Sequence, residues 1–134
     1  MPDLVIDTHI AVWALTEPQM LSVDAKAALI AAEANGIIYV SSMTLIELVY
    51  LTEKGKVAPD ILTLLRDALD DLTTAYRLYE INRTVADTVA LIPRAIVPEM
   101  PDRIIAATAL YLNLPLVTAD HKIQASNVQT IWKK

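Results

Sequence analysis

The chain lacks cysteine and has few glycines and prolines, and these absences exclude several classes of protein. Without cysteine it has no disulfide framework, zinc–thiolate site or thiol nucleophile. Two glycines and seven prolines in 134 residues exclude collagen-like and glycine-rich linker material. No low-complexity tract or fixed-period repeat interrupts the chain. With a length close to that of one domain, these features predict a single domain over residues 1–134.

Positive charge and long apolar runs are also scarce. Eleven Lys and Arg residues against 16 Asp and Glu give a net charge of −5, so a nucleic-acid role needs a local mechanism. An apolar content of 54% excludes a disordered chain, yet no run reaches the roughly 18 apolar residues of a membrane helix. The first residues lack the basic start of a signal peptide. We expect a soluble cytoplasmic domain with surplus apolar surface for a partner or a second copy, on helices 43–54 and 60–72.

Short β-type runs alternate with longer helical patterns. We expect strands at 4–6, 37–40, 76–81, 114–118 and 128–132. Helices are expected at 8–15, 23–34, 43–54, 59–72, 84–92 and 101–113. Ser22 and Ser42 are the expected N-caps, and Gly36 and Gly55 the expected C-terminal stops. Apolar strands separated by helices predict an α/β fold, a three-layer α/β/α sandwich around a central, mostly parallel five-stranded sheet.

Four acidic residues do not fit the pattern of a solvated helix face. Asp7 and Asp120 each follow an expected strand. Glu47 is the only charge in the apolar run 43–51, where an ionised carboxylate is costly unless it is paired or bound to metal. Asp102 stands at the start of a helix.

A structural role competes with a functional one at each of these positions. Asp7 is placed to cap the helix that follows it, and Asp102 to favour the positive end of its own helix. Asp120 fits a turn. Glu47 is suited to a buried ion pair with an arginine.

The expected topology nevertheless gathers the four acids. In an open α/β sheet, ligands bind beyond the carboxyl ends of the strands, where the strand order reverses. Asp7 and Asp120 lie at that end, Glu47 about one turn into a helix that follows a strand, and Asp102 at a helix N-terminus. Converging carboxylates repel one another unless a cation compensates. An all-oxygen ligand set favours Mg²⁺ or Mn²⁺ over zinc.

Four ordered stretches span nearly the whole chain: VIDTH at 5–9, SMTLIEL at 42–48, DRIIAATA at 102–109 and LPLVTAD at 114–120. In this order and spacing they resemble the PIN-domain family, specifically the VapC-type toxin ribonucleases of VapBC toxin–antitoxin pairs. The resemblance implies a PIN-like fold with a five-stranded parallel sheet between helices. It also implies a homodimer, and a neutralising antitoxin that covers apolar grooves and the active site, often with a basic side chain among the carboxylates.

The resemblance further implies a metal-dependent endoribonuclease. The family's acidic positions are occupied by Asp7, Glu47, Asp102 and Asp120. Thr118 would be a supporting polar residue, and Thr8 a further one.

Metal chemistry accounts for the expected reaction. A divalent ion lowers the pKa of its bound water and screens charge that builds on the phosphate. Asp7 and Asp102 are the expected direct metal ligands, while Glu47 and Asp120 ligate, hold metal waters or orient the attacking water. Hydrolysis by such a water needs no 2′-hydroxyl and leaves a 5′-phosphate. Single-stranded or loop RNA is the expected substrate, because its bases and backbone can reach a small crevice.

Other residues have two interpretations. Arg103 either contacts phosphate or pairs with another acid. His9 is a base or ligand, or else a packed, hydrogen-bonded histidine. Trp13 and Trp132 are interpreted as core or interface residues rather than stacking platforms.

Two other function classes stay open. One is a PIN-like binding module that has lost catalysis. The other is a metal-dependent phosphatase, although a haloacid-dehalogenase-like enzyme requires a second aspartate two positions after its nucleophile, where this chain has His9.

Overall fold

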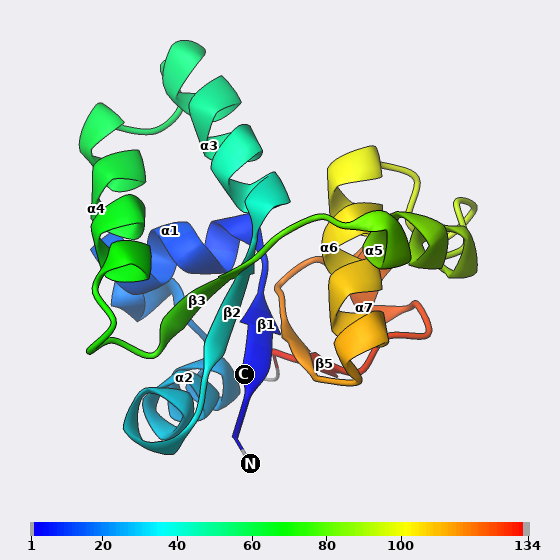
Figure 1. Ribbon diagram of the computed structural model, residues 1–134, viewed down its shortest axis with the longest axis horizontal. Coiled ribbons are helices and arrows are strands. Elements are labelled where there is room, and N and C mark those ends of the chain that lie inside the picture. The colour runs from blue at the N-terminus through cyan, green and yellow to red at the C-terminus, as the bar shows by residue number, and fades with distance from the viewer. Residues whose placement is uncertain (1, 133–134) are drawn as a thin grey trace.

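A five-stranded parallel sheet forms the centre of the protein in the computed structural model, which describes residues 2–132 (Figure 1). Its order is β3-β2-β1-β4-β5, and every neighbouring pair is parallel. The strands are β1 (Leu4–Ile6), β2 (Ile38–Ser41), β3 (Tyr76–Tyr79), β4 (Leu116–Val117) and β5 (Thr130–Ile131). The predicted fold class is therefore confirmed. The predicted domain limits at residues 1 and 134 lie outside the described residues.

Strand β1 is the point at which the strand order reverses. Val5 pairs with Tyr39 of β2 on one side and with Leu116 of β4 on the other. In parallel α/β sheets such a reversal leaves a crevice at the carboxyl ends of the strands, because the following helices leave in opposite directions. A ligand site is therefore expected at the carboxyl ends of β1 and β4.

Two helical layers cover the sheet (Figure 1). The first contains α1 (Thr8–Thr16), α2 (Val23–Asn35), α3 (Ser42–Glu53) and α4 (Pro59–Asp70), with a 3₁₀ turn η1 (Pro18–Met20). The second contains α5 (Arg83–Thr88), a 3₁₀ turn η2 (Val89–Leu91), α6 (Met100–Leu112) and α7 (His121–Gln124). Successive residues of β1 serve both layers, since Leu4 and Ile6 join the first apolar cluster and Val5 the second.

The ends of the helices confirm some predictions and correct others. The Ser22 hydroxyl accepts the Ala25 amide at 3.1 Å, so the predicted cap of α2 is confirmed. The cap of α3 is Ser41 rather than the predicted Ser42, whose hydroxyl instead accepts the amide of Ile81 at 3.1 Å.

The two glycines end their helices differently. Gly55 follows α3 in the left-handed conformation (φ 71°) that favours glycine. Gly36 ends α2 as predicted, but it does so with extended backbone (φ −139°) rather than in a left-handed conformation. A Cβ there would lie 3.0 Å from the carbonyl carbon of Pro2, so close approach of the N-terminal segment, rather than φ, favours glycine.

Several element lengths also differ from prediction. The helix predicted at 84–92 divides into α5 and η2, and α7 forms at His121–Gln124, where no helix was predicted. Strands β3, β4 and β5 are shorter than predicted. β4 and β5 pair over only two residues. Among residues 2–132, no helix combines the length and apolar character needed to cross a membrane.

The anchoring of α3 gives the first test. Leu48 is fully buried in the first apolar cluster, whereas Ile46 on the same helix is 45% exposed. We expect Leu48→Ala to lower the free energy of unfolding by about 2–5 kcal/mol in denaturant melts, because it leaves a cavity. Ile46→Ala is the control and should cost less than about 1 kcal/mol. Equal losses would contradict this orientation of α3.

Candidate active site

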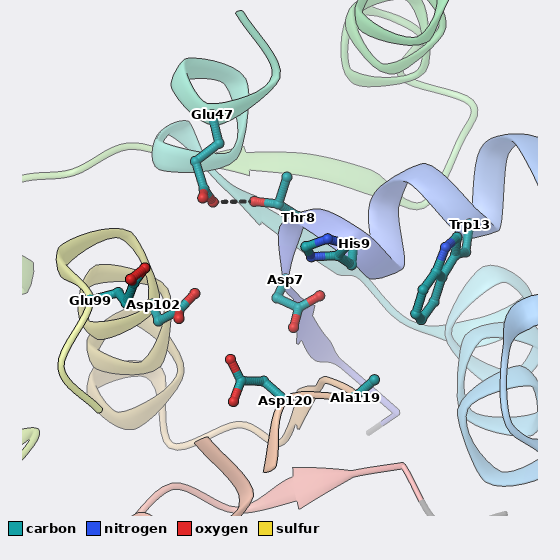
Figure 2. Close-up of a pocket in the computed structure, with 9 residues that line it drawn as sticks. All are labelled: Asp7, Thr8, His9, Trp13, Glu47, Glu99, Asp102, Ala119 and Asp120. Carbon is teal, nitrogen blue, oxygen red and sulfur yellow. Dashed lines mark hydrogen bonds between the residues drawn. The ribbon is translucent and has the colours of Figure 1, made fainter. Parts of the chain in front are cut away.

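A cavity of about 350 Å³ opens beyond the carboxyl ends of β1 and β4. Its lining residues are Asp7, Thr8, His9, Trp13, Glu47, Glu99, Asp102, Ala119 and Asp120 (Figure 2). All four acids singled out in the sequence line this one cavity. Glu99 is a fifth carboxylate that the sequence analysis missed; its place one helical turn before Asp102 is the signal that could have found it.

Asp7 combines a structural and a cavity-lining position. Its Oδ1 accepts the amide of Ile10 at 3.0 Å and so caps α1, which confirms the capping alternative. Its carboxylate is nevertheless part of the cavity wall (Figure 2). Burial raises the pKa of Asp7, while the hydroxyl of Thr118 and the amide of Ile10 act in the opposite direction. The Asp7 carboxylate is thus buried, and it accepts hydrogen bonds that favour its charged form.

Glu47 is held by hydroxyls rather than by an arginine. The Thr8 hydroxyl donates to Glu47 Oε1 at 2.5 Å, and Thr8 Oγ1 lies 3.1 Å from Thr44 Oγ1 (Figure 2). The predicted alternative of a buried ion pair is wrong, because the ion pair found among residues 2–132 is the exposed Arg83–Asp87. The hydroxyl contact joins the start of α1 to α3 and orients the Glu47 carboxylate at the cavity.

Asp102 lies in the first turn of α6, where burial and neighbouring carboxylates act on it. Its pKa is raised to about 6, first by burial and then by the charges of Asp120, Glu47, Asp7 and Glu99. A helix N-terminus normally stabilises a carboxylate. The net shift is in the opposite direction, so the helix end does not compensate for burial and like charge.

Asp120 caps α7, with Oδ1 accepting the amide of Lys122 at 2.8 Å. Its own amide donates to the hydroxyl of Thr118 at 3.0 Å. Thr118 is fully buried, and its hydroxyl also bears on the pKa of Asp7. The predicted turn role is thus refined to a helix cap, and Thr118 links the two acids that follow β1 and β4.

Among residues 2–132, Arg103 forms no ion pair with an acid, so that predicted alternative is wrong. Its Nε and Nη2 donate to the carbonyl of Ile92 at 3.1 and 2.8 Å, and Nη2 also donates to the carbonyl of Val89 at 3.0 Å. The guanidinium therefore ties the η2 segment to α6. None of the described residues that line the cavity is a lysine or an arginine.

Two aromatic residues complete the wall on the side of α1. His9 is exposed, so the packed-histidine alternative is wrong, and Trp13 is half-buried. Trp13 also packs against Trp132, with ring centroids 5.9 Å apart. Trp13 is consequently both a packing residue and a lining residue of the cavity.

The donor chemistry of the cavity suits a hard divalent cation. Five carboxylates face it, and oxygen ligands are those that Mg²⁺ and Mn²⁺ prefer. Within residues 2–132, no group of three or more His, Asp or Glu side chains is already arranged to hold a metal ion. The residues present therefore fit such an ion by ligand type, without forming a closed ligand shell by themselves.

The sequence is similar to known proteins over most of its length. The family model of the PIN domain matches residues 4–127. A curated relative, Ribonuclease VapC22 of Mycobacterium tuberculosis, is 30% identical over 135 residues, which cover 98% of this chain and 100% of the relative.

Solved structures share the fold. VapBC2 from Rickettsia felis, bound to a DNA fragment from its promoter, superposes with a TM-score of 0.71 at 19% identity and covers 96% of each chain. A toxin–antitoxin complex from Klebsiella pneumoniae gives a TM-score of 0.58 at 25% identity, covering 91% of this chain and 90% of the other. FitAcB from Neisseria gonorrhoeae gives 0.58 at 21% identity, covering 95% of each.

The raised pKa of Asp102 predicts a pH-dependent gain in stability on its removal. Because the pKa is about 6 in the folded chain against 3.8 for the ordinary group, the charge opposes folding at pH 7. Allowing for solvent screening of a half-buried group, Asp102→Asn should raise the free energy of unfolding by about 1 kcal/mol, or Tm by roughly 3–5 °C.

This gain should fade as the pH falls through 6 and vanish near pH 3.8, where the carboxyl is protonated in both states. Thermal melts at pH 4 and pH 7 measure it. Asp67→Asn, at an exposed acid of α4, is the control and should change Tm little at either pH. A destabilised Asp102→Asn at pH 7 would contradict the electrostatic argument.

Proposed function

The chain belongs to the PIN-domain family, and from this premise we propose that it is a VapC-type toxin, an endoribonuclease that hydrolyses RNA phosphodiester bonds with a divalent metal ion. One observation carries the proposal. The five carboxylates of the chain that surround a single cavity come from four separate parts of the sequence and meet at the reversal of strand order. A fold that gathers unneutralised acids bears an energetic cost, which cation binding relieves.

Asp7 and Asp102 are the residues that would hold the ion directly, with Glu47 and Asp120 completing its ligands or orienting the attacking water. A bound Mg²⁺ or Mn²⁺ would lower the pKa of water toward neutrality and offset charge that builds on the phosphate. Hydrolysis by water does not consume the 2′-hydroxyl, so the product should carry a 5′-phosphate.

The polar residues around the acids have positioning roles in this proposal. Thr8 fixes the Glu47 carboxylate through its 2.5 Å hydrogen bond. Thr118 connects Asp7 and Asp120. Because the chain is acidic overall, a bound cation would supply local attraction for RNA at this cavity. Single-stranded or loop RNA suits its size better than duplex.

An apolar groove beside the acid-lined cavity favours an antitoxin as the partner. A second hollow of about 340 Å³ lies between α3 and α6, is mainly apolar and shares Glu47 with the acid-lined cavity. Ile46, Tyr50 and Met100 on its rim are 45%, 60% and 63% exposed. We expect an apolar antitoxin segment to occupy this α3–α6 groove and to direct a basic side chain at the carboxylates. One wall of the groove is α3, the helix predicted at 43–54, and the other is α6 rather than the helix predicted at 60–72.

Two further properties belong to the proposal. We expect a homodimer, which the mass of the isolated protein in solution will test against 14.7 kDa for one chain. We also expect a cytoplasmic location, where RNA and a newly made antitoxin are both present.

Nuclease activity is tested by incubating single-stranded RNA with the purified chain and Mg²⁺ or Mn²⁺. We expect internal cleavage with 5′-phosphate ends, and a loss of at least about 100-fold with EDTA or in Asp7→Asn, because a direct ligand is removed. Asp67→Asn, which is exposed and remote from the cavity lining, should keep the wild-type rate.

Three results would contradict the proposal. Cleavage that survives Asp7→Asn would indicate a contaminant or another site. Hydrolysis of a small phosphomonoester with RNA left intact would favour a phosphatase. A folded chain that binds its partner but cleaves nothing would be a binding module.

The partner surface has its own test. Tyr50→Asp places a charge on the apolar groove and should weaken binding of the antitoxin, which we expect to be encoded beside this gene, by at least tenfold, measured by calorimetry. RNA cleavage should change little, because Tyr50 does not line the acid-lined cavity. Ile30 lies on α2, and its side chain is 59% exposed. Ile30→Asp is therefore the matched control and should bind the antitoxin normally. Equal binding by both variants would place the antitoxin elsewhere.

A further inference from the structure

One side of the acid-lined cavity is aromatic. His9 and Trp13 lie four residues apart on α1, so their side chains project from the same helix face. Their ring centroids are 5.9 Å apart, with planes tilted by 56°. Both residues line the cavity, and Figure 2 shows His9 next to Asp7 and Trp13 further along α1, on the side away from Asp102. Since His9 is exposed and Trp13 half-buried, the core does not enclose either ring.

Trp13 is also supported from outside the cavity. The Trp132 ring packs against it at 5.9 Å, with planes 36° apart, and Trp132 does not line the cavity. Both indoles pack on the first apolar cluster. A side chain that neighbours already hold loses little conformational freedom when a ligand contacts it, so it binds with a smaller entropic cost.

The charge of the other walls restricts what these rings can receive. The remaining wall carries five carboxylates, and no lysine or arginine is among the described lining residues. A phosphate would be repelled everywhere except beside a cation. The uncharged, planar part of a nucleotide is its base, which can lie against aromatic rings without that repulsion. Stacking on an aromatic side chain tolerates any base, because every base has a π-face.

We propose that His9 and Trp13 form a stacking platform for an unpaired base of the RNA, next to the cleaved bond. This inference rests on the proposed ribonuclease function and adds a binding subsite to it. The cavity of about 350 Å³ lies at the small end of the range of roughly 300–1,000 Å³ for ligand sites, which suits one nucleotide. Because a stacked base must leave its duplex partner, the platform selects single-stranded over double-stranded RNA.

The first test needs no change to the protein. A short RNA that the wild-type chain cuts at one bond is remade with a single abasic nucleotide, placed in turn at each position around that bond. We expect one position beside the bond to raise KM by roughly 5- to 100-fold, with a smaller change in kcat. Abasic nucleotides elsewhere should change KM less than about twofold.

Variants then link that position to the platform. Trp13→Leu should raise KM for the intact RNA by a similar factor but add no further loss on the sensitive abasic RNA, because the stacked pair is already missing. Trp13→Phe should restore most of the affinity. Trp132→Leu removes the indole that supports Trp13 without itself lining the cavity, so as the matched control it should cause a smaller loss than Trp13→Leu. Thermal melts identify any variant that fails to fold.

Each alternative outcome overturns the inference in a recognisable way. No sensitive abasic position, or additive losses for Trp13→Leu and the abasic RNA, would mean that no base stacks on Trp13. An equal loss in Trp132→Leu would indicate packing alone. Unchanged cleavage with weakened antitoxin binding in Trp13→Leu would assign the rings to the partner. If the wild-type chain cuts no RNA at all, the proposed function fails first, and the platform with it.

Discussion

Repulsion among carboxylates gathered at the ends of β1 and β4 is the constraint on which the candidate site depends. It helps to raise the pKa of Asp102 to about 6. The chain limits the cost by giving three of the acids hydrogen-bond donors: the Ile10 amide for Asp7, the Thr8 hydroxyl for Glu47 and the Lys122 amide for Asp120. These contacts hold the acids in place but do not neutralise them, so the cavity retains a strong preference for positive charge.

The topology of the sheet brings the acids together with very short strands. β4 pairs over two residues, yet it fixes the position of Asp120 relative to Asp7, because β4 lies directly beside β1. Helices that begin shortly after the strands carry the acids: Asp7 caps α1, and Asp120 caps α7. Long strands are unnecessary, since only their carboxyl ends form the crevice.

Much of this arrangement could be predicted from the sequence, because isolated acids in apolar surroundings mark positions where charge is costly. Glu47 and Asp7 stand out in that way, whereas Glu99 lies in an exposed, proline-rich segment, where only its place one turn before Asp102 separates it from ordinary surface acids. The partners of Arg103 were also beyond reach, because the Ile92 carbonyl becomes available only where η2 ends against α6. Ser41 and Ser42 are both residue types that cap helices, so the sequence does not show which of them caps α3. In the structure the Ser41 hydroxyl accepts the amide of Met43.

The place of Arg103 has a consequence for selectivity. Successive residues of a helix point about 100° apart, so Arg103 follows Asp102 in sequence but serves backbone carbonyls instead of acting as its counter-ion. An internal counter-ion would compete with any visiting cation. No such counter-ion is among the described lining residues, so the negative potential of the cavity attracts free cations and basic side chains alike. At physiological salt this potential is screened beyond about 8 Å. Selectivity between free cations and basic side chains must therefore come from size and coordination at contact distance, not from long-range electrostatic attraction.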